Sequence, residues 1–180
     1  MKLAVHLVLG AVFALGAPAF AATPAPAAAA NDPHLKAEHV KAVQDLLAAM
    51  QAEKLMRSTA SASRYNSEAQ RKAVFDKLDK VPAAVIHQRL AAPVAKLVSA
   101  ETAAEMTRFY GSSFGQKVLK EKYNSGPRVM LGQQGPVPTA AEKKELKRPE
   151  YLKASKALAD AEPGIEHECF VLLQAIIKGK

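Results

Sequence analysis

The chain has 180 residues, of which 49% are hydrophobic and 23% are charged, and its formal net charge is +8. Its single cysteine, Cys169, excludes an internal disulfide. Ala, Leu, Lys, Glu, Gln and Met dominate, and alternating runs of β-branched residues are missing, which is typical of helical proteins. We therefore predict an all-α fold, an irregular bundle of about six to eight short helices.

Residues 1–21 have the pattern of a cleaved signal peptide. Lys2 precedes an almost continuous apolar run, Leu3–Leu15, and Ala19–Ala21 fits the small-x-small rule for cleavage after Ala21. The alternative is a membrane anchor, but the run is shorter than the roughly 20 residues that a span requires, and prolines follow it. No cysteine follows the run either, which argues against a lipoprotein anchor. We expect a periplasmic or secreted protein whose mature chain has no transmembrane span.

Residues 22–32 are rich in Ala and Pro and are predicted to form a disordered linker, so that residues 33–180 form a single helical domain. Without residues 1–21 the net charge is +7. This charge suits acidic envelope partners such as lipopolysaccharide phosphates, anionic lipid or peptidoglycan carboxylates, or it serves only solubility. Nucleic acid is not an expected partner, because aromatic residues are not interleaved with the basic ones.

The first half of this domain is expected to contain several separate helices. One should start at Asp32–Pro33, and the apolar residues after it fall out of phase near Gln51–Glu53, which predicts a break there. Ser61–Asn66 is small and polar and is predicted to be a helix end and loop. Ser67–Gln70 has the spacing of a capping box, and Pro93 should kink or split the helix in which it lies.

Two helices are predicted to meet within residues 107–123, at what we call the helix corner. Ser99 should cap the first helix, and Gly111–Ser112 should end it. Ser113 and Gln116 have the three-residue spacing of a capping box, with Ser113 as the cap of the second helix.

Aromatic residues surround this corner. We expect Phe109, Tyr110 and Phe114 to pack together and to set the angle between the two helices. Gly115 should leave room for their close approach. The hydroxyls of Tyr110 and Ser112 are either satisfied within the fold or point outward to a ligand.

The next segment is expected to be a loop followed by a broken helix. Asn124–Pro138 contains three Gly and three Pro, and Val129–Leu131 within it either docks on the core or forms an exposed partner-binding knob. Thr139–Glu142 is a further capping box, and Pro149 should break the following helix at Arg148.

Two more helices are expected after that break, separated by Pro163–Gly164. The first, at about residues 149–161, should present one face made of Tyr151, Leu152, Ser155 and Leu158. The second has an apolar stripe made of Ile165, Cys169, Leu172, Leu173, Ile176 and Ile177. This stripe places Cys169 in the core as an inert thiol, with an intermolecular bridge as the alternative.

Residues 99–110 and 139–150 resemble each other at an offset of 40 residues, and we call this similarity the echo. Both segments open with a hydroxyl cap, and Glu105 and Arg108 of the first correspond to Glu145 and Arg148 of the second. The echo is either a decayed duplication of a helical hairpin or a chance similarity between two capped helices.

The helix corner also carries a family resemblance. Ser99–Glu101, Glu105–Tyr110 and Ser112–Lys117 are similar to the pattern hydroxyl-x-E…E-(L/M)-x-x-F-Y-x-S-x-x-G-(Q/K)-K of an exported bacterial family known as domain of unknown function 2059. The similarity covers residues 85–150 best, and Pro149 stands where a second copy would carry an aromatic residue. It implies a small exported helical protein. Because the family's function is uncharacterised, it implies no reaction and no catalytic residue.

The residues that usually carry catalysis or bind metals are poorly arranged. His34 and His39 are five residues apart, which is not the i, i+4 spacing of a two-His metal site. Residues 166–169, EHEC, offer four possible ligands, but neighbours on a helix point about 100° apart. Residues 111–115, GSSFG, match a nucleophile elbow only in their letters, because they join two helices and Ser113 is the expected cap.

We therefore predict no catalytic, cofactor-binding or metal-binding residue. The leading hypothesis is an exported, basic, non-enzymatic helical protein of unknown role that binds a protein, a peptide or an acidic envelope component. One alternative is a periplasmic stress holdase, a chaperone that keeps unfolded clients from aggregating. Another is a small-ligand-binding or hydrolytic protein that acts at the helix corner. The sequence does not indicate an oligomeric state.

Overall fold

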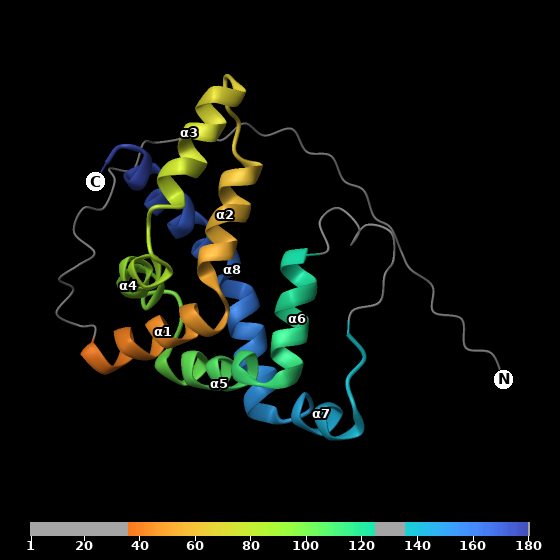
Figure 1. The fold of residues 1–180 in the computed structure, drawn as a ribbon. Helices are drawn as coiled ribbons and strands as arrows, with labels where there is room; N and C mark the ends of the chain where they lie inside the picture. Colours follow the sequence, from red (N-terminus) through yellow and green to blue (C-terminus); the bar gives the residue numbers. More distant parts are fainter. Residues whose placement is uncertain (1–35, 125–135, 180) are drawn as a thin grey trace, which may run out of the picture.

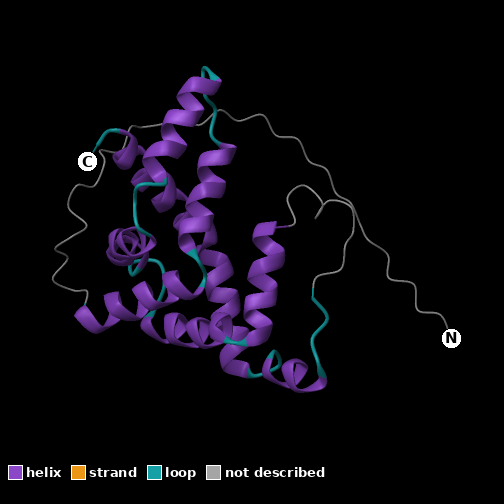
Figure 2. Cartoon of the chain, viewed as in Figure 1, coloured by secondary structure: helices purple, strands orange, loops and turns teal. Residues whose placement is uncertain are grey.

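The computed structural model describes residues 36–124 and 136–179, and within these ranges the chain forms helices and turns without strands (Figure 1, Figure 2). The helices of these ranges are α1 (Ala37–Ala49), α2 (Ala52–Ala62), α3 (Glu68–Leu78), α4 (Ala83–Val94), α5 (Ala100–Gly111), α6 (Ser113–Asn124), α7 (Ala140–Glu145) and α8 (Pro149–Ile177). This confirms the predicted all-α bundle. The predicted signal peptide, the Ala/Pro linker, the helix start at Asp32–Pro33 and the segment Val129–Leu131 lie outside the described residues.

Helix α8 is the central element of the bundle. It contacts α2, α3, α4 and α5, while α1 packs against α4 and α5 (Figure 1). The buried residues of α8 are Ala154, Leu158, Ile165, Cys169, Leu172, Leu173 and Ile176. Their spacing keeps them on one side of the helix, so that a single apolar face of α8 organises most of the core.

The predicted break at Pro163–Gly164 is wrong, because α8 runs without interruption from Pro149 to Ile177. Pro163 is exposed, so its ring lies on the solvent side, and the helix lacks one backbone hydrogen bond there. Gly164 faces Leu97, whose Cδ1 would lie 2.9 Å from an added Cβ. Because Leu158 and Ile165 are buried on the two sides of the proline, core packing stabilises a helix that local propensity would interrupt.

The predicted face of residues 149–161 is only partly buried. Leu158 is buried and Tyr151 and Ser155 are half-buried, but the side of α8 that carries Leu152 points to solvent, and this residue is 53% exposed. Ala154 takes the buried position instead.

Several other boundaries follow the predictions. Gln51, between α1 and α2, has a left-handed backbone with φ 58°, so the chain turns at the predicted break. The Ser67 hydroxyl caps α3 by accepting from the N–H of Gln70, although the Gln70 side chain accepts from Asn66 rather than from Ser67. Pro93 lies in the last turn of α4, which ends at Val94, so the proline ends this helix and does not kink its interior.

Candidate functional site at the helix corner

The helix corner is built around Ser112, which ends α5 and caps α6. Its hydroxyl donates to the carbonyl of Phe109 at 2.6 Å and accepts from the N–H of Gly115 at 3.0 Å. The predicted capping box is therefore wrong by one residue, because α6 already begins at Ser113, whose side chain is exposed. The sequence offers a hydroxyl at both positions, but Ser112 is the one with the extended backbone that a cap requires, with φ −75° and ψ 159°. The Ser112 hydroxyl is satisfied within the fold.

This shift leads to a testable difference between two adjacent serines. We expect Ser112→Ala to lower the free energy of unfolding by about 1 kcal/mol, because it removes the cap, and Ser113→Ala to change it by less than about 0.5 kcal/mol. Urea unfolding followed by circular dichroism measures both values. A larger loss for Ser113→Ala than for Ser112→Ala would show that the cap has been assigned to the wrong residue.

Gln116 ties the corner to the junction between α1 and α2 and does not cap α6. Its amide nitrogen donates to the carbonyl of Tyr110 at 2.5 Å, and its amide oxygen accepts from Gln51 at 3.1 Å. Further along α6, the hydroxyl of Tyr123 donates to the carbonyl of Met50 at 2.9 Å. Both ends of α6 are thus held to the same junction.

The predicted aromatic packing is confirmed, with Phe109 at its centre. The ring centroid of Phe109 lies 5.1 Å from that of Tyr110 and 6.4 Å from that of Phe114, both in edge-on arrangements. Tyr151 of α8, which the sequence did not assign to the corner, lies closer still at 4.9 Å. Gly115 lies directly against the backbone of α5, as predicted. We call the four rings the aromatic cluster.

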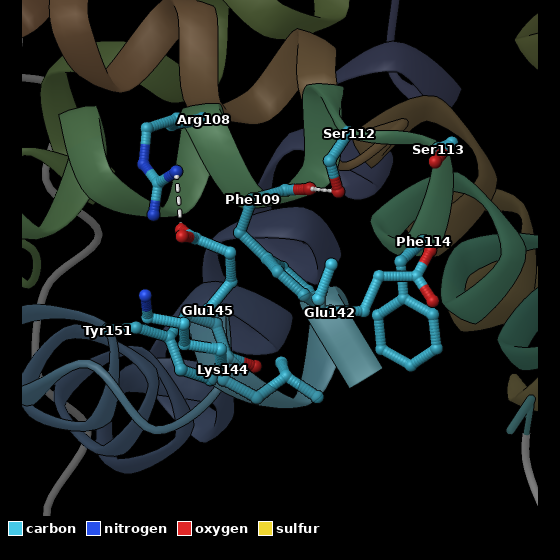
Figure 3. A pocket seen from close by; sticks show the side chains of 11 residues that line it. Arg108, Phe109, Ser112, Ser113, Phe114, Glu142, Lys144, Glu145 and Tyr151 are labelled. Carbon is cyan, nitrogen blue, oxygen red and sulfur yellow. Dashed lines mark hydrogen bonds and ion pairs between the residues drawn. The ribbon is translucent and has the colours of Figure 1, made fainter. Parts of the chain in front are cut away.

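Two adjoining cavities, of about 280 and 300 Å³, share three rings of this cluster as a wall, and together we call them the corner groove. Figure 3 shows the first of the two. The residues that line both are Phe109, Phe114, Leu146 and Tyr151. The first cavity lies between the corner and α7, and the second between α6 and α8. The second is lined further by apolar residues that include Met50, Leu55, Met106, Val118, Leu158 and Ile165. A mainly apolar wall with a few polar groups is typical of ligand pockets.

Four charged residues form a network that joins α5 to α7 and the start of α8. Arg148 binds Glu105 through two hydrogen bonds of 3.0 and 3.4 Å, and Arg108 binds Glu105 at 2.8 Å. Arg108 also binds Glu145 at 3.1 Å, at the wall of the groove (Figure 3). The four residues are the Glu-x-x-Arg residues of the two segments of the echo, and each segment binds the other through them. We call this network the Glu–Arg clasp. The echo therefore has a physical role, whatever its origin.

The structure brings part of the predicted corner to the groove. The predicted residues that line it are Phe109, Tyr110, Ser113 and Phe114, whereas Gly115 and Gln116 do not. Sequence reasoning missed Leu146, Tyr151, Lys122 and Glu162, which come from helices far apart along the chain. One signal was present, because the echo relates Leu146 to Met106, and both residues line the groove.

Cys169 and two histidines of the described residues are engaged within the fold. Cys169 is fully buried, as predicted, and this burial raises the pKa of its thiol to about 12. His87 is buried and lies 2.8 Å from a carboxylate oxygen of Glu53, while His39 lies 2.7 Å from a backbone carbonyl. Among the described residues, no three His, Cys, Asp or Glu side chains are grouped in a way that could hold a metal ion.

Comparison with known proteins gives no match: no family model, curated protein or solved structure is significantly similar to the chain. The resemblance to domain of unknown function 2059 therefore depends on the motif residues within 99–117 alone. Within residues 36–124 and 136–179, no helix is both long enough and apolar enough to cross a membrane.

Proposed function

We propose that the chain is an exported, periplasmic helical protein that binds an envelope component through the corner groove and catalyses no reaction. The observation that carries this proposal is the mainly apolar corner groove, which lies at the residues of the family-like motif. The signal-peptide pattern and the resemblance to an exported family support the location. The positive net charge supports a negatively charged envelope component as the partner.

The polar groups of the groove favour binding over catalysis. Glu145 is paired with Arg108, and Glu142 is held in the capping box of α7, where its carboxylate accepts from the N–H of Thr139 at 2.7 Å. Burial raises the pKa of Tyr110 to about 12, which makes this hydroxyl harder to deprotonate than an ordinary tyrosine. Such groups orient a ligand but offer neither an activated nucleophile nor a free base.

The holdase alternative has less support. The exposed large hydrophobic residues of the described ranges are Val85, Leu97, Val137, Leu152 and Phe170. Leu152 and Phe170 lie about 27 Å apart along α8, and the other three belong to other segments. A surface for unfolded clients would require a contiguous apolar patch. Suppressed aggregation of a model client at stoichiometric amounts would favour the holdase over the groove.

Binding of a neutral apolar dye, N-phenyl-1-naphthylamine, tests the groove. We expect a saturable rise in dye fluorescence with the mature protein, and Ala159→Phe should weaken binding at least tenfold. Ala159 lines the groove from an exposed position, so the larger side chain fills the groove without overpacking the core. The matched control is Ala157→Phe on the same helix, which should bind the dye like the wild type. Unsaturable binding, or equal effects of the two variants, would refute the proposal.

Export has its own test. Cell fractionation should place the protein in the periplasm, and N-terminal sequencing should find Ala22 as the first residue, because cleavage is expected after Ala21. An uncleaved chain in the cytoplasm would contradict the proposed location without affecting the groove.

A further inference from the structure

We propose that the ligand of the corner groove is an amphiphile with a single anionic head, a phosphate or a carboxylate. Its apolar chain lies in the groove, and its head is bound by Lys54, Arg57 and Lys122. This inference rests on the proposed function, because it requires the groove to be a binding site. The observation behind it is a polar cavity that adjoins the groove at Lys122.

The polar cavity has a volume of about 480 Å³ and lies between α2 and α6. The residues that line it are Lys54, Arg57, Ser58, Ser61, Lys122, Tyr123 and Asn124. Three of them are cations, Ser58 and Asn124 add a hydroxyl and an amide, and the wall contains no carboxylate. The hydroxyls of Ser61 and Tyr123 already donate to backbone carbonyls. Such a set of donors matches the oxygens of a phosphate or a carboxylate.

The charges around the cavity do not balance. Arg57 is paired with Asp79, and Lys122 is paired with Glu162 at 2.5 Å. Lys54 forms no ion pair with any described residue, and its Nζ lies 5.8 Å from the centre of the Tyr123 ring. The site therefore keeps the positive charge of Lys54, which an anionic head would neutralise.

The polar cavity adjoins the corner groove at Lys122, which lines both. Phe114, Val118 and Lys122 follow one another at intervals of four residues and share one face of α6. This face leads from the aromatic cluster to the cation over about 12 Å. An apolar wall that ends in a cationic cavity is complementary to a molecule with an apolar chain and an anionic end.

The dimensions of the groove favour a chain over a helical peptide. Each half of the corner groove, at about 280 and 300 Å³, is at the lower end of the range for small-molecule pockets. A helix with its side chains is about 10–12 Å wide. A single acyl or alkyl chain needs far less width, and we therefore assign the groove to an amphiphile.

The experiment compares dodecyl phosphate, dodecanol and inorganic phosphate, all below their aggregation limits, as competitors of the neutral dye and as ligands in calorimetry. We expect dodecyl phosphate to bind at least tenfold more tightly than dodecanol and inorganic phosphate to bind much more weakly. Lys54→Gln should weaken the binding of dodecyl phosphate at least fivefold and leave the binding of dodecanol and of the dye unchanged. Lys120→Gln, an exposed lysine of α6 that lines none of these cavities, is the control and should leave all three unchanged.

Each other result overturns the inference in a recognisable way. If the dye and dodecanol bind but dodecyl phosphate binds no better than dodecanol, the groove is a binding site but the proposed site for the anionic head is wrong. If inorganic phosphate binds as tightly as dodecyl phosphate, the site takes a free anion and not an amphiphile. If an acidic helical peptide displaces the dye while dodecyl phosphate does not, the ligand is a protein. If the dye itself does not bind, the proposed function fails together with this inference.

Discussion

The substitution Gly115→Ala should destabilise the protein by about 3 kcal/mol, close to the upper end of what overpacking costs. A Cβ at this position would lie 2.1 Å from the carbonyl oxygen of Phe109 and 2.8 Å from the Cα of Tyr110. Both atoms belong to the backbone of α5, so no side-chain rotation relieves the clash, and α6 must move away from α5. Alanine is the better helix former by about 1 kcal/mol, but this gain is smaller than the cost of the displacement. Urea unfolding measures the loss.

The matched control is Gly111→Ala at the other side of the same corner. An added Cβ at Gly111 meets no atom within 4 Å, and Gly111 is the last residue of α5. We expect this variant to be as stable as the wild type or slightly more stable, because alanine favours the helix. Equal free energies of unfolding for the two variants would mean that the close approach of α5 and α6 is not the feature that Gly115 serves.

The elements that could be predicted from the sequence are those whose signals are local. The caps at Ser99 and Thr139 were predicted, and both accept from the backbone N–H three residues later. The turn at Gln51 was visible because the apolar stripe changes phase there. In each case the residues that form the structure are neighbours in the chain, so their spacing carries the information.

Two predictions failed because the deciding contacts lie elsewhere. The continuity of α8 through Pro163 depends on burial of the residues on both sides against other helices, which a local proline signal cannot report. The choice of Ser112 over Ser113 as cap depends on how α6 approaches α5, because both residues carry the same hydroxyl. The groove combines residues of α2, α5, α6, α7 and α8, and apart from the predicted residues of the helix corner only Met106 and Leu146 were connected by a sequence pattern.

The second large effect is expected at the Glu–Arg clasp, where Glu105→Ala should lower the free energy of unfolding by about 2 kcal/mol. The Glu105 side chain is only 14% exposed and binds both Arg108 and Arg148. Its removal leaves two guanidinium groups close together with Glu145 as their shared acid. The Arg148 side chain is 31% exposed, so water partly replaces the lost partner, and the expected cost is below that of a fully buried pair. Urea unfolding at low and high salt measures it.

The control for this prediction is Asp160→Ala, which breaks the pair of Lys156 and Asp160 on the exposed side of α8. Those side chains are 77% and 65% exposed, so the loss should stay below about 0.5 kcal/mol. A double-mutant cycle of Glu105→Ala and Arg148→Ala then isolates their interaction, which we expect to exceed 1 kcal/mol because the two groups form two hydrogen bonds. A coupling near zero would mean that Glu105 acts through Arg108 within α5 alone. The clasp would then not hold the start of α8 against α5, and the wall of the groove formed by Leu146 and Tyr151 would depend on apolar contacts only.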